Sequence, residues 1–352
     1  MVHTSQIRRG WQLAHLFGIV FTLLGVSVGP TLAQDRELGT IELEVNLELG
    51  GADEADEYIL GNLSAVVEDS EGNIYASDVK QQAVHKFASN GRFLTSMTLV
   101  GGGPGDLMPH ASLAIDSKDR LYFAGQGGRV EIVDTSFEPI ESFQRENPAE
   151  IPRGISVLGD GSVAISVKNL GKETTIDLYG PDHIYVSSFS DSFGKGRDLS
   201  WHVTNPYTGG DIALLGPATL VYAQIAPYSI RAFDSAGRLI VETSDGGFDF
   251  VPDPPMPKIE SGRVSYRMPP STTGVATVID DNVLVSSHRL DENNQGHTLL
   301  CLYDQNLVLL GLRESSGSEF VVGSTRGGEV FVFQRSDEAF LLVKATVRLV
   351  KT

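Results

Sequence analysis

One short pattern occurs six times along this chain: a polar turn followed by a run of apolar, β-branched and aromatic residues typical of a β-strand. The six runs are GNIYAS, DRLYFA, GSVAIS, ATLVYA, DNVLVS and GEVFVF, aligned on Asn73, Arg120, Ser162, Thr219, Asn282 and Glu329. The spacings between these positions are 47, 42, 57, 63 and 47 residues. Periods of about 40–50 residues are typical of propeller blades. We therefore predict an all-β fold, a six-bladed β-propeller of four-stranded blades.

The residues around each run fit the rest of a blade. A third strand, a turn and a fourth strand follow most of the runs, and a run of small apolar residues precedes each of them. Small residues suit the innermost strands because these strands crowd around the propeller axis. The predicted inner strands are LSAVV, ASLAI, RGISV, IALL, GVATV and EFVVG.

The sixth unit lacks a fourth strand, because FLLVKATVRLV runs to the end of the sequence. A separate strand pattern, TIELEVNLEL at residues 40–49, precedes the first unit. We predict that this strand completes the last blade and closes the ring, which removes an exposed sheet edge. An unpaired N-terminal strand is the alternative.

Blade one resembles the NHL-repeat type of six-bladed β-propeller. Gly72-Asn73-Ile74-Tyr75, Asp78, Val84 and Phe87, and then Asn90-Gly91 follow the order of that repeat, and Gly103-Pro104-Gly105 follows the blade as it often does there. Ala83 stands where an Arg is usual, whereas Arg129 keeps that residue in blade two. The resemblance implies a bacterial, exported propeller spanning residues 34–352 as one domain.

Residues 1–33 have the features of a signal peptide. Arg8 and Arg9 form a positively charged start, an apolar stretch follows, and Thr31-Leu32-Ala33 offers small residues for cleavage. We expect a periplasmic or extracellular protein without stable membrane insertion after cleavage, and a retained membrane anchor is the alternative. The formal net charge of −18 lacks the basic footprint that binding to nucleic acid requires. The single cysteine, Cys301, lies in a strand pattern, and we expect it to be buried and structural.

Two long insertions, residues 190–211 and 245–274, account for the longer spacings between units. Long loops in compact domains often carry function. Such links lie on one face of a propeller, around the central channel, and the glycine-rich link GGGPGDL leads to His110 on this face. The candidate ligand-binding residues at the channel mouth and rim are His110, Arg153, Trp201, His202, Tyr207, Tyr228, His288, Arg289 and Arg335. His110 and Arg153 stand just before predicted inner strands, so we expect them to contribute most.

A calcium-dependent enzyme on this fold needs several oxygen ligands at the axis. Only Asn62 and Glu319 lie at the starts of the predicted inner strands, so we expect no cofactor and leave calcium as a weak alternative. No G-x-S-x-G, H-E-x-x-H or C-x-x-C motif occurs. We therefore expect a binding module for a protein, peptide or saccharide, without catalytic activity of its own. A metal-dependent lactonase- or esterase-like hydrolase, a lyase, and a structural part of a cell-envelope complex remain alternatives.

Overall fold

The computed structural model describes residues 37–51, 60–98, 112–125, 127–168, 173–193, 195–196, 207–247, 258–260, 263–265, 271–290, 296–315, 318–335 and 340–351. Residues 37–352 form one compact unit, and the predicted signal peptide lies outside the described residues. Within the described part of the chain, no helix has the length and apolar character needed to span a membrane.

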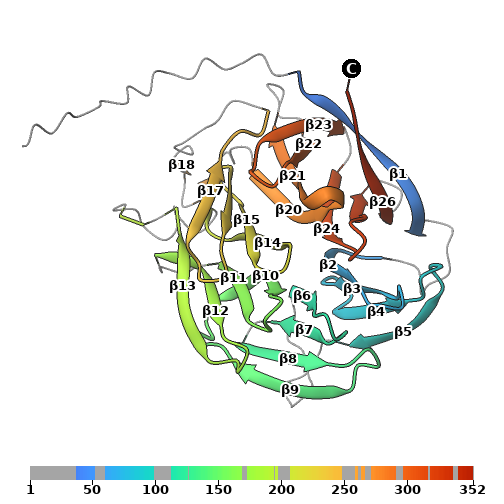
Figure 1. Cartoon of the computed structure of the whole chain (residues 1–352), viewed down its shortest axis with the longest axis vertical. Helices are drawn as coiled ribbons and strands as arrows, with labels where there is room; N and C mark the ends of the chain where they lie inside the picture. Colours follow the sequence, from blue (N-terminus) through green and yellow to red (C-terminus); the bar gives the residue numbers. More distant parts are fainter. Residues whose placement is uncertain are drawn as a thin grey trace, which may run out of the picture. The chain divides into compact units, whose positions relative to one another are not determined.

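Six four-stranded antiparallel blades surround a central axis (Figure 1). Blade 1 consists of β2 (Leu63–Glu68), β3 (Ile74–Asp78), β4 (Ala83–Phe87) and β5 (Phe93–Thr98). Blade 2 consists of β6 (Ser112–Ile115), β7 (Leu121–Ala124), β8 (Arg129–Val133) and β9 (Pro139–Gln144). Blade 3 consists of β10 (Ile151–Val157), β11 (Val163–Lys168), β12 (Thr174–Tyr179) and β13 (Tyr185–Asp191).

The second half of the ring repeats this order. Blade 4 consists of β14 (Gly210–Leu215), β15 (Thr219–Gln224), β16 (Ser229–Phe233) and β17 (Leu239–Thr243). Blade 5 consists of β20 (Ser271–Val278), β21 (Asn282–Leu290), β22 (Gly296–Tyr303) and β23 (Leu309–Ser315). Blade 6 consists of β24 (Ser318–Ser324), β25 (Val330–Arg335), β26 (Phe340–Val350) and the N-terminal β1 (Gly39–Gly50). The predicted six-bladed all-β fold is confirmed.

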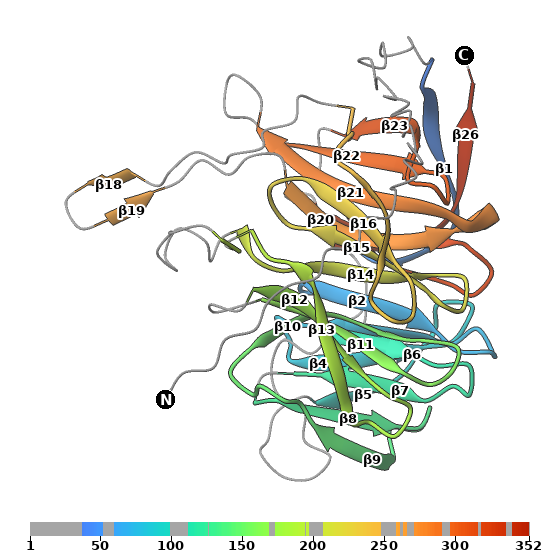
Figure 2. The ribbon, with the colours of Figure 1, turned by 60° about the vertical axis from the view of Figure 1, so that its left-hand side comes forward.

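The closing strand lies where the sequence predicted it. β1 pairs antiparallel with β26 from Thr40↔Val350 to Gly50↔Leu341, and the two strands run side by side in Figure 2. β1 also pairs in parallel with β23 of blade 5, at Gly39↔Gly311 and Thr40↔Leu312. This second pairing, which the sequence did not predict, joins blades 5 and 6 into one eight-stranded sheet.

The two predicted loop insertions are described only in part. Within 245–274, β18 (Lys258–Glu260) and β19 (Arg263–Ser265) pair in a small sheet of their own, which stands apart from the blades in Figure 2. The last two residues of the predicted insertion 190–211 are the first two residues of β14. Gly210 and Asp211 therefore belong to an inner strand rather than to a loop. That boundary matters for the site, because Asp211 faces the axis.

The hydrophobic core lies between neighbouring blades. Six buried clusters occur among the described residues, one at each of the six blade interfaces. The cluster between blades 4 and 5 contains Cys301, which is fully buried as predicted, and burial raises the pKa of its thiol to about 11. Because the core fills the interfaces between blades, the axis itself is left for a channel lined by the inner strands.

Candidate functional site

A cavity of about 700 Å³ opens at the end of the channel where the inner strands begin. The loops between second and third strands also reach this mouth, through Val79 and Ile225. The polar residues of its lining are Asn62, Ser64, Ser112, Arg153, Asp211, Ser271, Thr272 and Thr273. A narrower cavity of about 220 Å³ continues along the axis and shares Ser64, Ser112, Arg153 and Asp211 with the mouth. We call the wider cavity the channel mouth.

β-Bulges direct several of these side chains toward the axis. In β10 the pairing with β11 steps from Pro152↔Val167 to Gly154↔Ser166, which leaves Arg153 without a ladder partner. Equivalent steps leave out Ser64 in β2 and Thr273 in β20. A bulge bends the strand and re-aims the side chain of the extra residue. Ser64 and Thr273 hydrogen-bond to Ser77 and Ser286 of their own blades, whereas blade 3 presents an arginine at this position.

Arg153 carries a positive charge with no partner among the described residues. No hydrogen bond or ion pair of its guanidinium occurs within the described ranges, although the group lies inside the cavity. The surrounding blades enclose the guanidinium, and this desolvation lowers the pKa of Arg153. The Arg153 side chain nevertheless remains exposed to solvent in the channel. A desolvated guanidinium gains most from an anion, because its planar fork can donate two parallel hydrogen bonds to carboxylate or phosphate.

Lys168, the last residue of β11, adds a second positive charge beside Arg153. Burial lowers the pKa of Lys168 first, and repulsion by Arg153 lowers it further. Gly209 shows how close the two side chains are: a Cβ there would lie 3.4 Å from both Arg153 Cγ and Lys168 Cα. The two neighbouring cations form a local positive field in an otherwise acidic protein.

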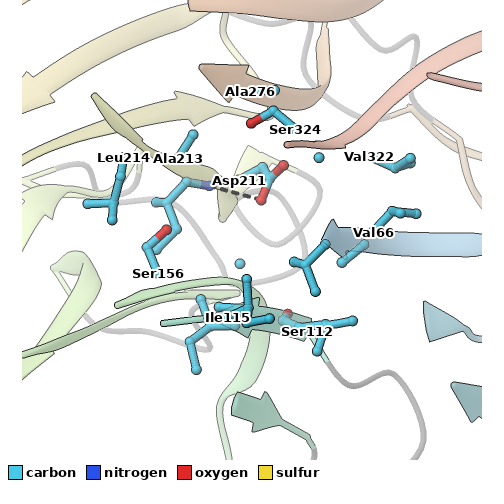
Figure 3. Close-up of a pocket in the computed structure, with 18 of the residues that line it drawn as sticks. Val66, Ser112, Ile115, Ser156, Asp211, Ala213, Leu214, Ala276, Val322 and Ser324 are labelled. Carbon is cyan, nitrogen blue, oxygen red and sulfur yellow. Dashed lines mark hydrogen bonds between the residues drawn. The ribbon is translucent and has the colours of Figure 1, made fainter. Parts of the chain in front are cut away.

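Asp211, on the neighbouring inner strand β14, is the one carboxylate of the described mouth lining. Its Oδ1 accepts the N–H of Ile212 at 2.9 Å, and its Oδ2 accepts the N–H of Val275 at 3.2 Å. Figure 3 shows this carboxylate among the side chains of Ser112, Ser156 and Val322. The walls of the channel desolvate the carboxylate and raise the pKa of Asp211 to about 7, against the lowering effect of the two backbone donors.

Two further charged residues line the narrower cavity, and both are paired. Glu68 Oε2 lies 2.6 Å from Lys344 Nζ, and Arg326 Nη2 lies 2.7 Å from Asp119 Oδ1. These ion pairs neutralise the lower part of the channel. Arg153 and Asp211 are therefore the two charged side chains of the described mouth lining, and Lys168 lies beside Arg153.

Of the candidate ligand-binding residues predicted from the sequence, Arg153 lines the cavity. Tyr207 and Tyr228 do not: both are buried, and Tyr228 lies between blades 4 and 5 with its hydroxyl 2.5 Å from that of Tyr303. Both rings are packed in protein contacts, so neither hydroxyl belongs to the described lining. His110, Trp201 and His202 lie outside the described residues.

The other three candidates lie at the ends of second strands and not in the lining. Arg289 forms an ion pair with Glu314 at 2.9 Å, and Arg335 lies over the Phe340 ring at 5.6 Å. His288 lies against Gly296, and burial together with the nearby His297 lowers its pKa. Their side chains are engaged by their own blades.

The two residues predicted as weak metal ligands have different surroundings. Asn62 lines the mouth, whereas Glu319 is buried and accepts hydrogen bonds from Arg313 at 3.1 Å and Gln334 at 3.3 Å. Across the described ranges, no group of three or more His, Cys, Asp and Glu side chains has an arrangement that could hold a metal ion.

Sequence reasoning missed Asp211 and Lys168. The predicted fourth inner strand began at Ile212, two residues too late, so Asp211 was assigned to the preceding loop. The signal was present: DIALL places an acidic residue directly before the apolar run of an inner strand. Lys168 could be found only once β11 was known to extend to the mouth.

Solved structures similar to this chain are propellers. A member of the DUF4221 family from Bacteroides vulgatus has a TM-score of 0.60 at 10% identity, covering 90% of this chain and 100% of that one. A putative exported protein from Bacteroides fragilis has a TM-score of 0.57 at 11% identity, covering 90% and 98%. The calcium-binding protein regucalcin from Agrobacterium tumefaciens has a TM-score of 0.51 at 10% identity, covering 86% and 96%.

These identities show that the chain shares the β-propeller fold with those proteins, and the fold alone. No family model matches the chain. No curated protein matches it either.

Proposed function

We propose that this chain is an exported β-propeller binding module that holds an anionic group of a protein, peptide or saccharide at its channel mouth, without catalytic activity of its own. The observation that carries the proposal is Arg153: an enclosed guanidinium without a described partner, inside a cavity of about 700 Å³. Removing a cation from water is costly unless it finds a counter-charge. A bound anion supplies that counter-charge.

The cavity size limits what can enter. Ligand pockets commonly have volumes of about 300–1,000 Å³, so the channel mouth accommodates a short peptide end or one to two sugar rings rather than a folded domain. Ser64, Ser112 and Thr273 line the same cavity as Arg153, and their hydroxyl groups can bind polar groups of the ligand. A peptide carboxyl terminus and an acidic sugar both combine these features.

Export and the NHL-type character of blade one belong to the same proposal. The features of residues 1–33 support a cleaved signal peptide. The similar structure from Bacteroides fragilis is that of a putative exported protein. The Gly72–Asn73 turn, Asp78 and Asn90-Gly91 support the NHL type. A periplasmic or extracellular propeller meets free peptide ends and saccharides.

Substitution of Arg153 by alanine tests the proposed site. The probes are D-glucuronate with glucose as its neutral match, and a tripeptide with a free or an amidated carboxyl terminus. We expect the wild type to prefer each acid over its neutral match, and Arg153→Ala to bind the acid about tenfold to a hundredfold more weakly, as loss of a charge-assisted hydrogen bond predicts. Isothermal titration calorimetry measures both affinities.

Arg92→Ala is the matched control, because Arg92 is an exposed residue on the turn after β4 and its loss changes the net charge equally. Affinity that falls equally in both variants would show a general charge effect and contradict the proposed site. Unchanged affinity in Arg153→Ala would also contradict it.

A second candidate function, a propeller enzyme of the hydrolase or lyase type, is favoured by Asp211. A carboxyl group with a pKa of about 7 in a cavity is suited to general acid–base catalysis near neutral pH. Turnover of lactones, aryl esters or uronate-containing oligosaccharides that is lost in Asp211→Asn would favour the enzyme. Metal analysis of the dialysed protein would then identify a tightly held calcium or zinc ion.

A further inference from the structure

The charged groups of the channel mouth differ in how they respond to an incoming anion. This difference concerns the same site as the proposed function, and the inference drawn from it rests on that function. We propose that Asp211 takes up a proton when an anion binds at Arg153 and Lys168, so that the channel mouth captures its acidic ligand preferentially at acid pH.

Asp211 lines the same cavity as Arg153, from the neighbouring inner strand. β10 and β14 are neighbouring inner strands in contact, and a Cβ on Gly154, the residue after Arg153, would lie 2.6 Å from Asp211 Oδ1. Both cavities include Arg153 and Asp211 in their lining. No ion pair joins Asp211 to a cation among the described residues, so an anion held by Arg153 faces an unneutralised carboxylate.

The elements packed around Asp211 contribute few other charges. β10 contributes Arg153, β11 contributes Lys168, and β20 contributes no charged residue. β15 contributes Tyr222, whose pKa burial raises to about 12, so its hydroxyl stays neutral. Glu68 and Arg326, further along the channel, are held in ion pairs. Asp211, with a pKa of about 7, is therefore an unpaired carboxyl group of the described cavity lining that changes charge near neutral pH.

The direction of the coupling follows from like-charge repulsion. An anion beside Asp211 raises the pKa of this carboxyl above its value of about 7 in the empty channel. Below pH 7 Asp211 is already neutral, and the affinity for the anion does not change with pH. Above pH 7 the empty site must gain a proton on binding, so the affinity falls by up to about tenfold per pH unit until the pKa of the bound state is reached.

Calorimetry on the mature wild-type protein tests the coupling directly. The probes are sulfate and D-glucuronate, because neither changes its own charge between pH 5.5 and 8.5. Titration in buffers of different ionisation enthalpy counts the protons taken up on binding. We expect uptake of about half a proton at pH 7 and slightly more at pH 8, and a dissociation constant about tenfold higher at pH 8.5 than at pH 6. Binding without proton uptake and without pH dependence would overturn the proposal.

Two variants separate the groups. Asp211→Asn is expected to bind the probes equally at pH 6 and 8.5, whereas Lys168→Met is expected to bind more weakly but to keep the dependence on pH. If Lys168→Met instead abolishes the pH dependence, the lysine is the titrating group and the inference about Asp211 is wrong. If Arg153→Ala weakens binding but proton uptake is absent in the wild type, the proposed anion site holds and only the coupling fails. Failure of the wild type to bind either probe at any pH contradicts both.

Discussion

Arg153 and Asp211 place two charges in the lining of one cavity. The two side chains lie on neighbouring inner strands, and enclosure lowers the pKa of Arg153 while it raises the pKa of Asp211. Neither group has a counter-ion among the described residues. No ion pair among the described residues compensates the desolvation of the Asp211 carboxylate, so this side chain adds no stability to the fold in its charged form.

The cost of Asp211 can be measured as a dependence of stability on pH. Its pKa rises from about 3.9 in an unfolded chain to about 7 in the folded protein, so the folded state holds the proton over this interval and the unfolded state does not. The contribution of this group to stability is greatest below pH 4 and is lost as the pH rises to 7. We expect Asp211→Asn to gain stability relative to the wild type from pH 4 to 7, by about 1–2 kcal/mol because channel water screens part of the cost.

Urea unfolding of the two proteins at pH 4.5, 6, 7 and 8.5 measures this difference. It should grow up to pH 7 and remain constant above. A difference that does not change with pH would show that Asp211 is ionised throughout, and its pKa would then be ordinary.

At the scale of strands and turns, the sequence predicted the fold well because each blade repeats the same local signals. The starts of β15 and β21 are those predicted from the repeat, and β3, β7, β11 and β25 begin one residue later. An Asp also recurs at turns between strands, where its Oδ1 accepts the N–H groups two and four residues on. It occurs at Asp69, Asp116, Asp134, Asp234 and Asp304. Such Asx turns set the direction of the chain through local hydrogen bonds, so they can be recognised from the sequence.

The bulges were not predictable in the same way. Whether a residue such as Arg153 is paired or left out of the ladder depends on how the inner strand is bent around the axis, which involves all the blades. A side chain one position away on a regular strand would face a neighbouring blade. For that reason Arg153 was identified from its place before an inner strand, whereas its exposure to the cavity is a result of the fold.

The pairing of β1 with β23 yields a test at the scale of elements. At Gly311 an added Cβ would lie 2.6 Å from the carbonyl oxygen of Gly39 and 2.4 Å from Leu349 Cδ1. We expect Gly311→Ala to separate β1 from β23 and to destabilise the protein by about 1–3 kcal/mol, as overpacking usually does. The measurement is the midpoint of urea unfolding.

Gly327→Ala is the control, since a Cβ at Gly327 meets nothing nearer than Thr325 Oγ1 at 3.6 Å. Equal midpoints for the two variants would show that the parallel pairing of Gly39 with Gly311 does not contribute to closure of the ring.

At the scale of the whole molecule, the position of the core explains why a site exists at the axis. Buried side chains fill the interfaces between blades. Small residues let the inner strands approach closely: a Cβ on Gly323 would lie 1.9 Å from the Val66 carbonyl oxygen. The axis stays open, and residues from all six inner strands contribute to the channel lining. The candidate site could be predicted from the sequence only in part, because residues from distant segments such as β11 and β14 meet only when the ring has formed.

An anion site at Arg153 would lie within a protein whose net charge of −18 otherwise repels anions. A crystal of the mature protein soaked in selenate tests it most directly, since selenium scatters anomalously and selenate carries the charge and shape of a tetrahedral anion. We predict an anomalous peak at the channel mouth, with selenate oxygens about 3 Å from the Arg153 guanidinium and within reach of Lys168. Anomalous peaks confined to the outer surface, with none beside Arg153, would contradict the account.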